Sequence, residues 1–370
     1  MRILYVADDL YEGYGGQARA TEGHLAALVA RGHTVTAVAG REPHPTVPPP
    51  GVRLVRMPAV QLGNVQTRIA YPIIGTLARE ISQADVVQAN TPAILTAAAL
   101  LLAHRQNVPV VLGLHTQIET STLQLPRFGG VVADLLRRWY RWLFSRADLL
   151  VAPTEFAAAT SRAFSHVRVE VVSNGIDFGS YSRPRTSTAG RQLAYLGRLS
   201  AEKRPQDLLK LMKALPTDHH LVMAGTGPLA AELAERVAAE GLAGRVRLAG
   251  FIDEDEKRVL LSQTDLFVMP SPAELQSIAT LEAMAAGCAV VAFDYASSAV
   301  PRLVTEAQAG VVVPADDAVA QAAAVVELLS DHQRLRAAQE SAQRYAALHD
   351  VARSAARLEQ LYSELASARR

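Results

Sequence analysis

The sequence predicts an α/β protein built from two doubly wound parallel sheets. Its 370 residues are about twice the usual domain size. Short β-branched runs alternate with helix-length segments throughout, as in parallel sheets that helices cover on both faces. The alternation stops once, at 182–191, where Ser, Thr, Pro and Gly replace apolar periodicity. Two such sheets facing one another would gather the carboxyl ends of their strands around one inter-domain cleft.

Runs of apolar and β-branched residues mark the expected strands in each half. In the first half they are 2–7, 34–39, 52–57, 85–88, 109–114 and 148–152, and in the second 192–197, 220–225, 245–250, 266–270, 289–293 and 310–314. From these we expect an N-terminal domain over 1–183, a linker over 184–191 and a C-terminal domain over 192–350. The Ala-rich, charge-alternating end, 351–370, is expected to form a helix that packs back on the N-terminal domain.

Composition excludes several classes of protein. A formal charge of +1, from 37 Lys and Arg against 36 Asp and Glu, removes the footprint of a general nucleic-acid binder. The single cysteine, Cys288, cannot form an internal disulfide, which favours a reducing compartment. The first residues do not read as a signal peptide, and the longest apolar stretch, 92–103, is shorter than the roughly 20 residues that cross a bilayer. We therefore expect a cytoplasmic protein.

The most informative segment is P-S-P-A-E-L-Q-S-I-A-T-L-E-A-M-A-A-G, at 270–287, directly after a strand. Glu274 falls in the loop, and Glu282 lies about one and a half turns into a helix expected to begin near Ser277. Backbone amides at that helix start suit a phosphate, and carboxylates suit sugar hydroxyls. The alternative is ordinary: an acid favoured by the helix dipole and a solvated face residue.

This segment closely resembles the donor-binding motif of family-4 retaining glycosyltransferases, which have the GT-B fold of two Rossmann-like domains. The resemblance rests on two glutamates separated by seven residues within L-E-A-M-A-x-G. It implies that Glu274 contacts the transferred sugar together with the amides that follow, and that Glu282 holds the ribose hydroxyls of a nucleotide-diphosphate sugar. The family most often has an aromatic residue or Gln, then Gly, then Leu after the first glutamate; here stand Leu275, Gln276, Ser277 and Ile278.

Two cations follow the strand at 193–196, in the turn G-R-L-S-A-E-K. Arg198 and Lys203 could neutralise a departing diphosphate, although the turn alone also reads as an exposed cap before a helix. Order and spacing resemble the family's diphosphate signature. A further loop, A-G-T-G-P-L-A at 224–230, superficially fits a dinucleotide fingerprint, but the next strand does not end in the acid that NAD binding requires. The resemblance implies instead that Gly225 and Ile252 border the nucleobase.

No metal or other cofactor is expected. Asp253 and Asp255 form a D-x-D, but Asp253 with Glu256 reads better as a capping box before a helix. No His and Cys cluster has metal-ligand spacing. The sequence therefore predicts a metal-independent enzyme.

The N-terminal half offers a glycine loop and a histidine. Gly15 and Gly16 precede a helix, where glycines let the backbone approach a ligand or merely turn tightly. His115 ends a strand in L-G-L-H-T, and a lone histidine is more often structural. The resemblance implies that Gly16 lies opposite the donor diphosphate and that His115 lies beside the reacting sugar. The acceptor would then contact Gly15, Gly16, His115 and Thr116.

Both tryptophans lie in a basic segment, 127–146. Its candidate membrane-facing residues are Arg137, Arg138, Trp139, Arg141 and Trp142. The alternative is a helix whose aromatic residues pack on the sheet while its arginines reach solvent. A membrane-facing helix would place a lipid or lipid-linked acceptor at a peripheral cytoplasmic site.

Together with these features, the resemblance implies a hexosyltransferase that uses a UDP- or GDP-sugar and transfers with retention to a hydroxyl acceptor. His115, Arg198, Lys203 and Glu274 are the predicted catalytic residues. The resemblance implies attack on the face from which the diphosphate leaves, since the sequence nominates no carboxylate nucleophile. Alternatives are a sugar-nucleotide epimerase or hydrolase of the same fold, a noncatalytic sugar-nucleotide binding protein and, more distantly, a nicotinamide oxidoreductase.

Overall fold

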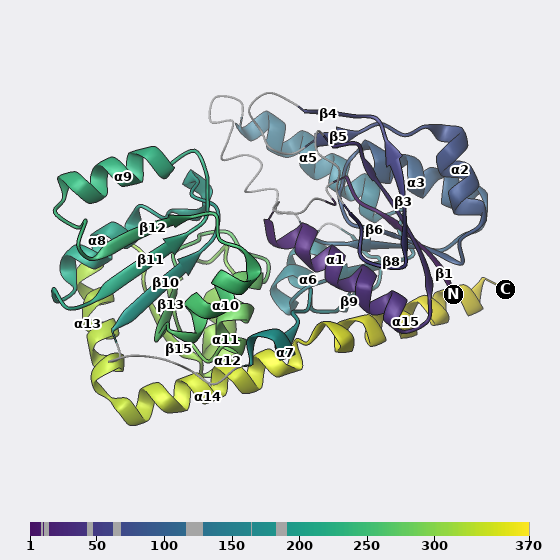
Figure 1. Cartoon of the computed structure of the whole chain (residues 1–370). Helices are drawn as coiled ribbons and strands as arrows, with labels where there is room; N and C mark the ends of the chain where they lie inside the picture. Colours follow the sequence, from purple (N-terminus) through teal and green to yellow (C-terminus); the bar gives the residue numbers. More distant parts are fainter. Residues whose placement is uncertain are drawn as a thin grey trace. The chain divides into compact units, whose positions relative to one another are not determined.

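The computed structural model describes residues 1–8, 10, 15–42, 47–61, 68–115, 129–163, 165–182 and 191–369. The chain divides into two compact units (Figure 1). Unit 1 contains Met1–Gly175 and Val351–Arg370, and unit 2 contains Ile176–Asp350. The division between Gly175 and Ile176 precedes the expected linker, of which only Arg191 is described.

Unit 1 contains a seven-stranded parallel sheet in the order β3-β2-β1-β6-β7-β8-β9. Its strands are β1 (Arg2–Val6), β2 (Thr34–Gly40), β3 (Val52–Met57), β6 (Val86–Ala89), β7 (Val110–Gly113), β8 (Leu149–Ala152) and β9 (Val169–Val171). Its helices are α1 (Gly15–Ala30), α2 (Ile74–Ser82), α3 (Ile94–Arg105), α5 (Gly129–Phe144), α6 (Glu155–Arg162) and α15 (Val351–Ala368). A short antiparallel pair, β4 (Ala59–Gln61) and β5 (Arg68–Ala70), was not predicted.

The C-terminal helix α15 belongs to the core of unit 1. Successive strand residues point to opposite faces of a sheet, so Ile3 and Tyr5 of β1 share one face. That face is buried in one cluster with residues of α1 and with Leu358 and Tyr362 of α15. Tyr362 also donates from its hydroxyl to Gln88 Oε1 of β6 at 3.0 Å. The helix therefore contributes both apolar burial and a buried hydrogen bond to the unit.

Unit 2 contains a six-stranded parallel sheet in the order β12-β11-β10-β13-β14-β15. The strands are β10 (Gln192–Leu196), β11 (His220–Ala224), β12 (Val246–Gly250), β13 (Leu266–Met269), β14 (Ala289–Asp294) and β15 (Gly310–Pro314). The helices are α7 (Phe178–Tyr181), the 3-10 turn η1 (Ala201–Lys203), α8 (Asp207–Ala214), α9 (Ala230–Ala239), α10 (Glu254–Ser262), α11 (Ile278–Ala285), α12 (Val300–Ala307), α13 (Ala318–Ser330) and α14 (His332–Leu348).

Each sheet reverses its strand order once, and the prediction of two doubly wound sheets is confirmed. In unit 1 the reversal lies between β1 and β6, and in unit 2 between β10 and β13. Ligands of open α/β sheets bind outside the carboxyl ends of the strands at this switch point. The residues that follow β10 and β13 are therefore the first place to look for a site in unit 2.

Within the described part of the chain, none of the helices combines the length and apolar character that crossing a lipid bilayer requires.

Candidate functional site

Two predicted site residues meet at the switch point of unit 2. Lys203 lies in the 3-10 turn after β10, and Glu274 lies in the loop after β13. The Lys203 Nζ and Glu274 Oε1 atoms are 2.6 Å apart, and their side chains are 28% and 12% exposed. Lys203 and Glu274 thus bring a cation and a carboxylate from neighbouring strand ends together in one partly exposed site.

Arg198 lies four residues before Glu202, and its guanidinium group has hydrogen-bond donors that are weakly satisfied. Its Nη1 lies 4.0 Å from Glu202 Oε1, at the outer limit of an ion pair. Its Nε is buried and finds no hydrogen-bond partner among the described residues. A buried donor without a partner is costly, and an anion would satisfy it.

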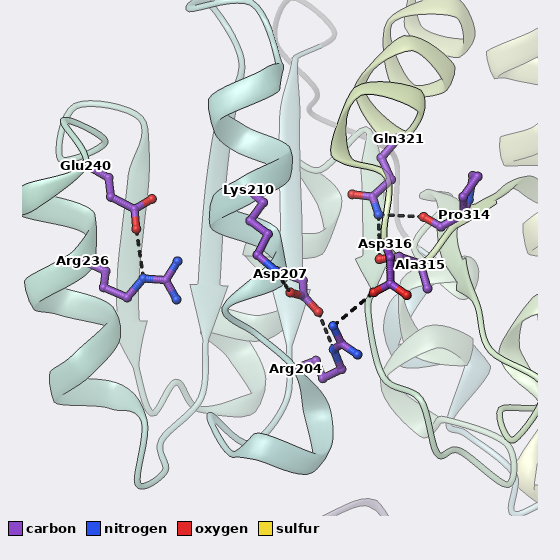
Figure 2. A network of polar contacts seen from close by, with 9 residues as sticks. All are labelled: Arg204, Asp207, Lys210, Arg236, Glu240, Pro314, Ala315, Asp316 and Gln321. Carbon is purple, nitrogen blue, oxygen red and sulfur yellow. Dashed lines mark hydrogen bonds and ion pairs between the residues drawn. The ribbon is translucent and has the colours of Figure 1, made fainter.

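The backbone that carries Lys203 is fixed by its neighbour Arg204, which has a left-handed conformation with φ of 51°. Figure 2 shows the two contacts of its side chain. Arg204 Nε donates to Asp207 Oδ2 at 2.5 Å, and Nη2 donates to Asp316 Oδ1 at 3.4 Å. Lys210 donates to the other Asp207 oxygen at 2.9 Å. These contacts tie the loop after β10 to the loop after β15.

The Glu274 loop is held equally firmly and ends in a strained cap. A parallel bridge pairs Glu274 with Ser298, and Ala299 N donates to the Glu274 carbonyl at 2.8 Å. Ser277 has φ of 67°, a region that non-glycine residues rarely adopt. Its Oγ accepts from Thr280 N at 3.3 Å and caps α11. The predicted helix start near Ser277 is confirmed.

Glu282 does not lie on a solvated face, so that alternative is wrong. It is 5% exposed. Its Oε1 accepts from the Tyr181 hydroxyl at 3.0 Å and from Lys257 Nζ at 2.8 Å. Sequence reasoning missed both partners. A signal existed for Lys257, because it occupies the same face of α10 as the buried Leu260 and Leu261.

The glycines of the G-T-G loop let two backbone segments touch. A side-chain carbon on Gly225 would lie 1.9 Å from the Gly197 carbonyl oxygen, and one on Gly227 would lie 2.3 Å from that of Leu199. Gly225 N also donates to Gly250 O at 2.7 Å, which joins this loop to the segment that leads to half-buried Ile252. Close backbone packing thus accounts for these glycines without any ligand.

The D-x-D segment is a helix cap. Asp253 Oδ1 accepts from Glu256 N at 2.8 Å, and Glu256 Oε2 accepts from Asp253 N at 2.9 Å. The predicted capping box is confirmed, and Asp255 pairs with Arg258 at 2.6 Å. Across the described ranges, no group of three or more His, Cys, Asp or Glu side chains is arranged to hold a metal ion.

In unit 1, His115 follows β7 at the carboxyl edge of the sheet. A side-chain carbon on Gly113 would lie 2.6 Å from Asn90 Oδ1 and 2.7 Å from His115 Nε2, so a larger residue there would require these side chains to shift. His115 Nδ1 is buried without a partner in the described residues. Burial, and then the neighbouring His24, lowers the pKa of His115 to about 3. The imidazole is therefore uncharged at neutral pH.

The other predicted residues of unit 1 are only partly described. Gly15, with φ of 68°, and Gly16 form the first residues of α1. Thr116 lies outside the described residues. Asn90, which was not among the predicted site residues, directly follows β6 beside the switch point. Its Oδ1 accepts from Gln88 Nε2 at 2.8 Å, and its Nδ2 donates to Thr21 Oγ1 at 3.1 Å.

The basic aromatic segment forms α5. Arg137, Arg138 and Arg141 are exposed, while Trp139 and Trp142 are half-buried and stacked with ring centroids 5.3 Å apart. Trp139 Nε1 donates to Pro92 O at 2.7 Å, and the Arg146 guanidinium lies 4.3 Å from the Trp142 ring centroid. The arginines thus face solvent, and the tryptophans are partly covered by the chain itself.

Comparison with known families agrees with this fold. The model of glycosyl transferases group 1 matches residues 183–345, and the model of glycosyltransferase family 4 matches residues 14–179. The chain belongs to glycosyltransferase family 4.

Characterised relatives are distant. The chain is 26% identical to a sulfoquinovosyl transferase of Arabidopsis thaliana over 70% of its own length and 52% of the relative. It is 29% identical to a phosphatidyl-myo-inositol mannosyltransferase of Mycolicibacterium smegmatis over 82% and 78%. A GDP-mannose-dependent alpha-mannosyltransferase of the same organism is 27% identical over 90% of each chain. The chain thus spans about half of the plant relative and most of the two mannosyltransferases.

Solved structures share the fold. A sucrose-phosphate synthase of Thermosynechococcus elongatus matches with a TM-score of 0.82 at 20% identity, covering all of both chains. Anabaena HepE in complex with UDP-glucose matches with a TM-score of 0.75 at 19% identity, covering 98% of this chain and 100% of that one. These likenesses establish the GT-B-like fold alone.

Proposed function

We propose that the protein is a retaining hexosyltransferase that moves a hexose from a UDP- or GDP-sugar to a hydroxyl acceptor. The observation that carries this proposal is the contact between Lys203 and Glu274 at the switch point of unit 2. A diphosphate requires cations and sugar hydroxyls favour carboxylate acceptors, and this place offers both. One relative is named for GDP-mannose, and HepE was solved with UDP-glucose, which supports this class of donor.

In the proposed reaction, the acceptor hydroxyl attacks the anomeric carbon from the face that the diphosphate leaves. The bond from this carbon to the acceptor oxygen forms as its bond to the phosphate oxygen breaks, and that phosphate oxygen takes the hydroxyl proton. Arg198 and Lys203 stabilise the charge that develops on the diphosphate. Glu274 accepts hydrogen bonds from hydroxyls of the transferred sugar.

The remaining predicted residues have binding roles in this proposal. Glu282 holds the ribose, and the sugar and phosphate lie against the segment of Leu275, Gln276, Ser277 and Ile278. Gly225 and Ile252 border the base, and Gly16 lies opposite the diphosphate. Gly15, Gly16, His115 and Thr116 contact the acceptor side. Since His115 is uncharged at neutral pH, it would act there as a hydrogen-bonding group.

A thermal-unfolding screen with UDP, GDP, ADP and their sugars tests the donor site. One diphosphate at 100 times its dissociation constant is expected to stabilise the protein by about 2.7 kcal/mol. Transfer from the matching sugar nucleotide should give a product whose anomeric configuration, read by proton NMR, equals that of the donor. The reaction is expected to survive a chelator. An inverted product or an absolute metal requirement would contradict the proposed reaction.

The same assay without acceptor separates the alternatives. An epimerase would interconvert donors, and a hydrolase would release free sugar, with no acceptor present. A noncatalytic binding protein would bind the donor and leave it intact. Two cations, Arg198 and Lys203, favour transfer over simple binding, because a departing diphosphate carries more negative charge than the bound sugar nucleotide.

The acceptor is proposed to be a lipid or lipid-linked glycan reached at an anionic membrane surface. The exposed arginines 137, 138 and 141 of α5 support this, each worth about 1 kcal/mol near such a surface. We expect the protein to sediment with phosphatidylserine vesicles at low salt and to be released at high salt. Reversal of the three charges to Glu should abolish sedimentation.

A matched triple reversal at Arg334, Arg336 and Arg344 provides the control. These residues are exposed on α14, so the change in net charge is the same. This variant should sediment like the wild type. Equal loss in both triple variants would show that net charge, and not the α5 surface, accounts for vesicle binding.

A further inference from the structure

Glu282 is supported by a small polar cluster of Tyr181, Glu254 and Lys257, of which Glu254 is 33% exposed. Lys257 Nζ lies 2.8 Å from Glu282 Oε1 and 2.9 Å from Glu254 Oε1, and its side chain is 11% exposed. The Tyr181 hydroxyl lies 3.0 Å from Glu282 Oε1 and 2.9 Å from Glu254 Oε2. All four residues belong to unit 2, on α7, α10 and α11.

The hydrogens in this cluster are unevenly shared. A tyrosine hydroxyl carries one hydrogen, so Tyr181 can donate to Glu254 or to Glu282 but not to both at once. Lys257 carries three hydrogens and a full positive charge, and it contacts both carboxylates. The lysine is thus the group that offsets the repulsion between the buried Glu282 carboxylate and the partly exposed Glu254 carboxylate.

Tyr181 and Lys257 both contact the Oε1 atom of Glu282. We propose that Lys257 is a positioning residue that keeps Glu282 ionised and directs its Oε2 atom toward the ribose hydroxyls of the donor nucleotide. This inference rests on the proposed function, in which Glu282 holds the ribose. An ionised carboxylate accepts hydrogen bonds from both hydroxyls of a vicinal diol. In a protonated carboxyl group one oxygen carries a hydrogen and acts as a donor instead. Lys257 would therefore determine ribose recognition without touching the substrate.

The charged surroundings define what removal of Lys257 would do. The titratable groups around Glu282 from α7 and α10 are Tyr181, Glu254, Lys257 and Arg258. From α14, which packs on α11, Gln343 reaches the Ala285 carbonyl with an uncharged amide at 3.3 Å. β13 carries no titratable side chain, and β14 carries Asp294 exposed at its end. Arg258 is already paired with Asp255.

Without Lys257, the buried Glu282 carboxylate and the partly exposed Glu254 carboxylate would face each other across one hydroxyl. Burial and like charge both raise a carboxyl pKa, so a proton would enter the pair as the pH falls. Glu282 would then lose its ionised form on the acid side and regain it on the alkaline side. Ribose binding in Lys257→Met should follow the same direction.

Calorimetric titration with UDP, GDP and their 2′-deoxy analogues, between pH 6 and 8.5, tests the inference. The wild type should bind one ribonucleotide with nearly constant affinity and prefer it over its 2′-deoxy analogue by at least about tenfold. Lys257→Met should bind at least about tenfold more weakly at pH 6, recover toward pH 8.5 and lose the ribose preference at pH 6. Its KM for the donor should rise while kcat at saturating donor changes little.

Three further variants keep the test sharp. Lys257→Arg should restore both affinity and ribose preference, because it returns the charge. Lys257→Met/Glu254→Gln should regain affinity at pH 6, because one of the two repelling carboxylates is gone. This double variant tests the inference even if the single variant unfolds. Tyr181→Phe should weaken binding without any pH dependence, because the ammonium remains.

The outcomes separate the two proposals. Wild-type protein that binds none of the four nucleotides overturns the proposed function and this inference together. Wild-type binding alongside a Lys257→Met variant with unchanged affinity, or with an equal loss at every pH and an intact ribose preference, overturns the inference alone.

Discussion

Replacing Lys203 by alanine is expected to lower kcat by about 10² to 10³ while the protein remains folded. The size follows from the loss of one preorganised donor at the place where charge develops on the leaving group. Lys203 meets Glu274 at the switch point, and its side chain is 28% exposed, so it does not support the core. Initial rates at saturating donor, with thermal unfolding measured in parallel, provide the readout.

Lys213→Ala is the matched control for this loss. Lys213 is also in unit 2 and also near a glutamate, with its Nζ 3.6 Å from Glu240 Oε2, but it lies on α8 and is 55% exposed. It should turn over like the wild type. If Lys203→Ala kept near-wild-type turnover, Lys203 would have no part in stabilising the diphosphate and the proposed mechanism would fail.

The second large effect is on folding. Gly225→Ala is expected to destabilise unit 2 by about 4 kcal/mol, as the sum of backbone strain and overpacking. Gly225 has φ of 145°, and an added side-chain carbon would lie 1.9 Å from the Gly197 carbonyl oxygen. Neither backbone segment can move freely, because Gly197 N donates to Ala224 O at 3.0 Å. Urea unfolding followed by circular dichroism measures the loss.

Gly244→Ala controls for the loss of a glycine as such. Gly244 is exposed, and no atom lies within 4 Å of an added side-chain carbon. Its substitution should change the free energy of unfolding by less than about 0.5 kcal/mol. Equal stabilities of the two alanine variants would mean that the loop after β11 does not pack on the turn after β10 as described.

Most of the fold could be predicted from the sequence, because buried parallel strands are short runs of β-branched residues between helix-length segments. The site could be predicted from the sequence where a motif is local. The α11 cap at Ser277 and the capping box at Asp253 and Glu256 both depend on residues three positions apart. The β4–β5 pair escaped because three-residue strands carry little pattern.

Contacts between residues that are far apart in the sequence could not be predicted from it. Tyr181 and Lys257 are 101 and 25 residues from Glu282. The buried face of α10 marks Lys257, but nothing in the local pattern joins either residue to Glu282. The glycines of the G-T-G loop illustrate a different difficulty. A glycine admits a ligand or another backbone equally well, and only the position of Gly197 and Leu199 shows that Gly225 and Gly227 meet backbone.

The place of α15 in the core of unit 1 has a consequence for synthesis on the ribosome. Domains generally fold as units, the N-terminal one first, as the chain emerges. Here the β-sheet of unit 1 is made early, but Leu358 and Tyr362, which help α1 to cover one of its faces, are made only after all of unit 2. Unit 2 is contiguous in the chain and can complete its fold first. The nascent N-terminal half must therefore keep part of this apolar sheet face uncovered until α15 has been made.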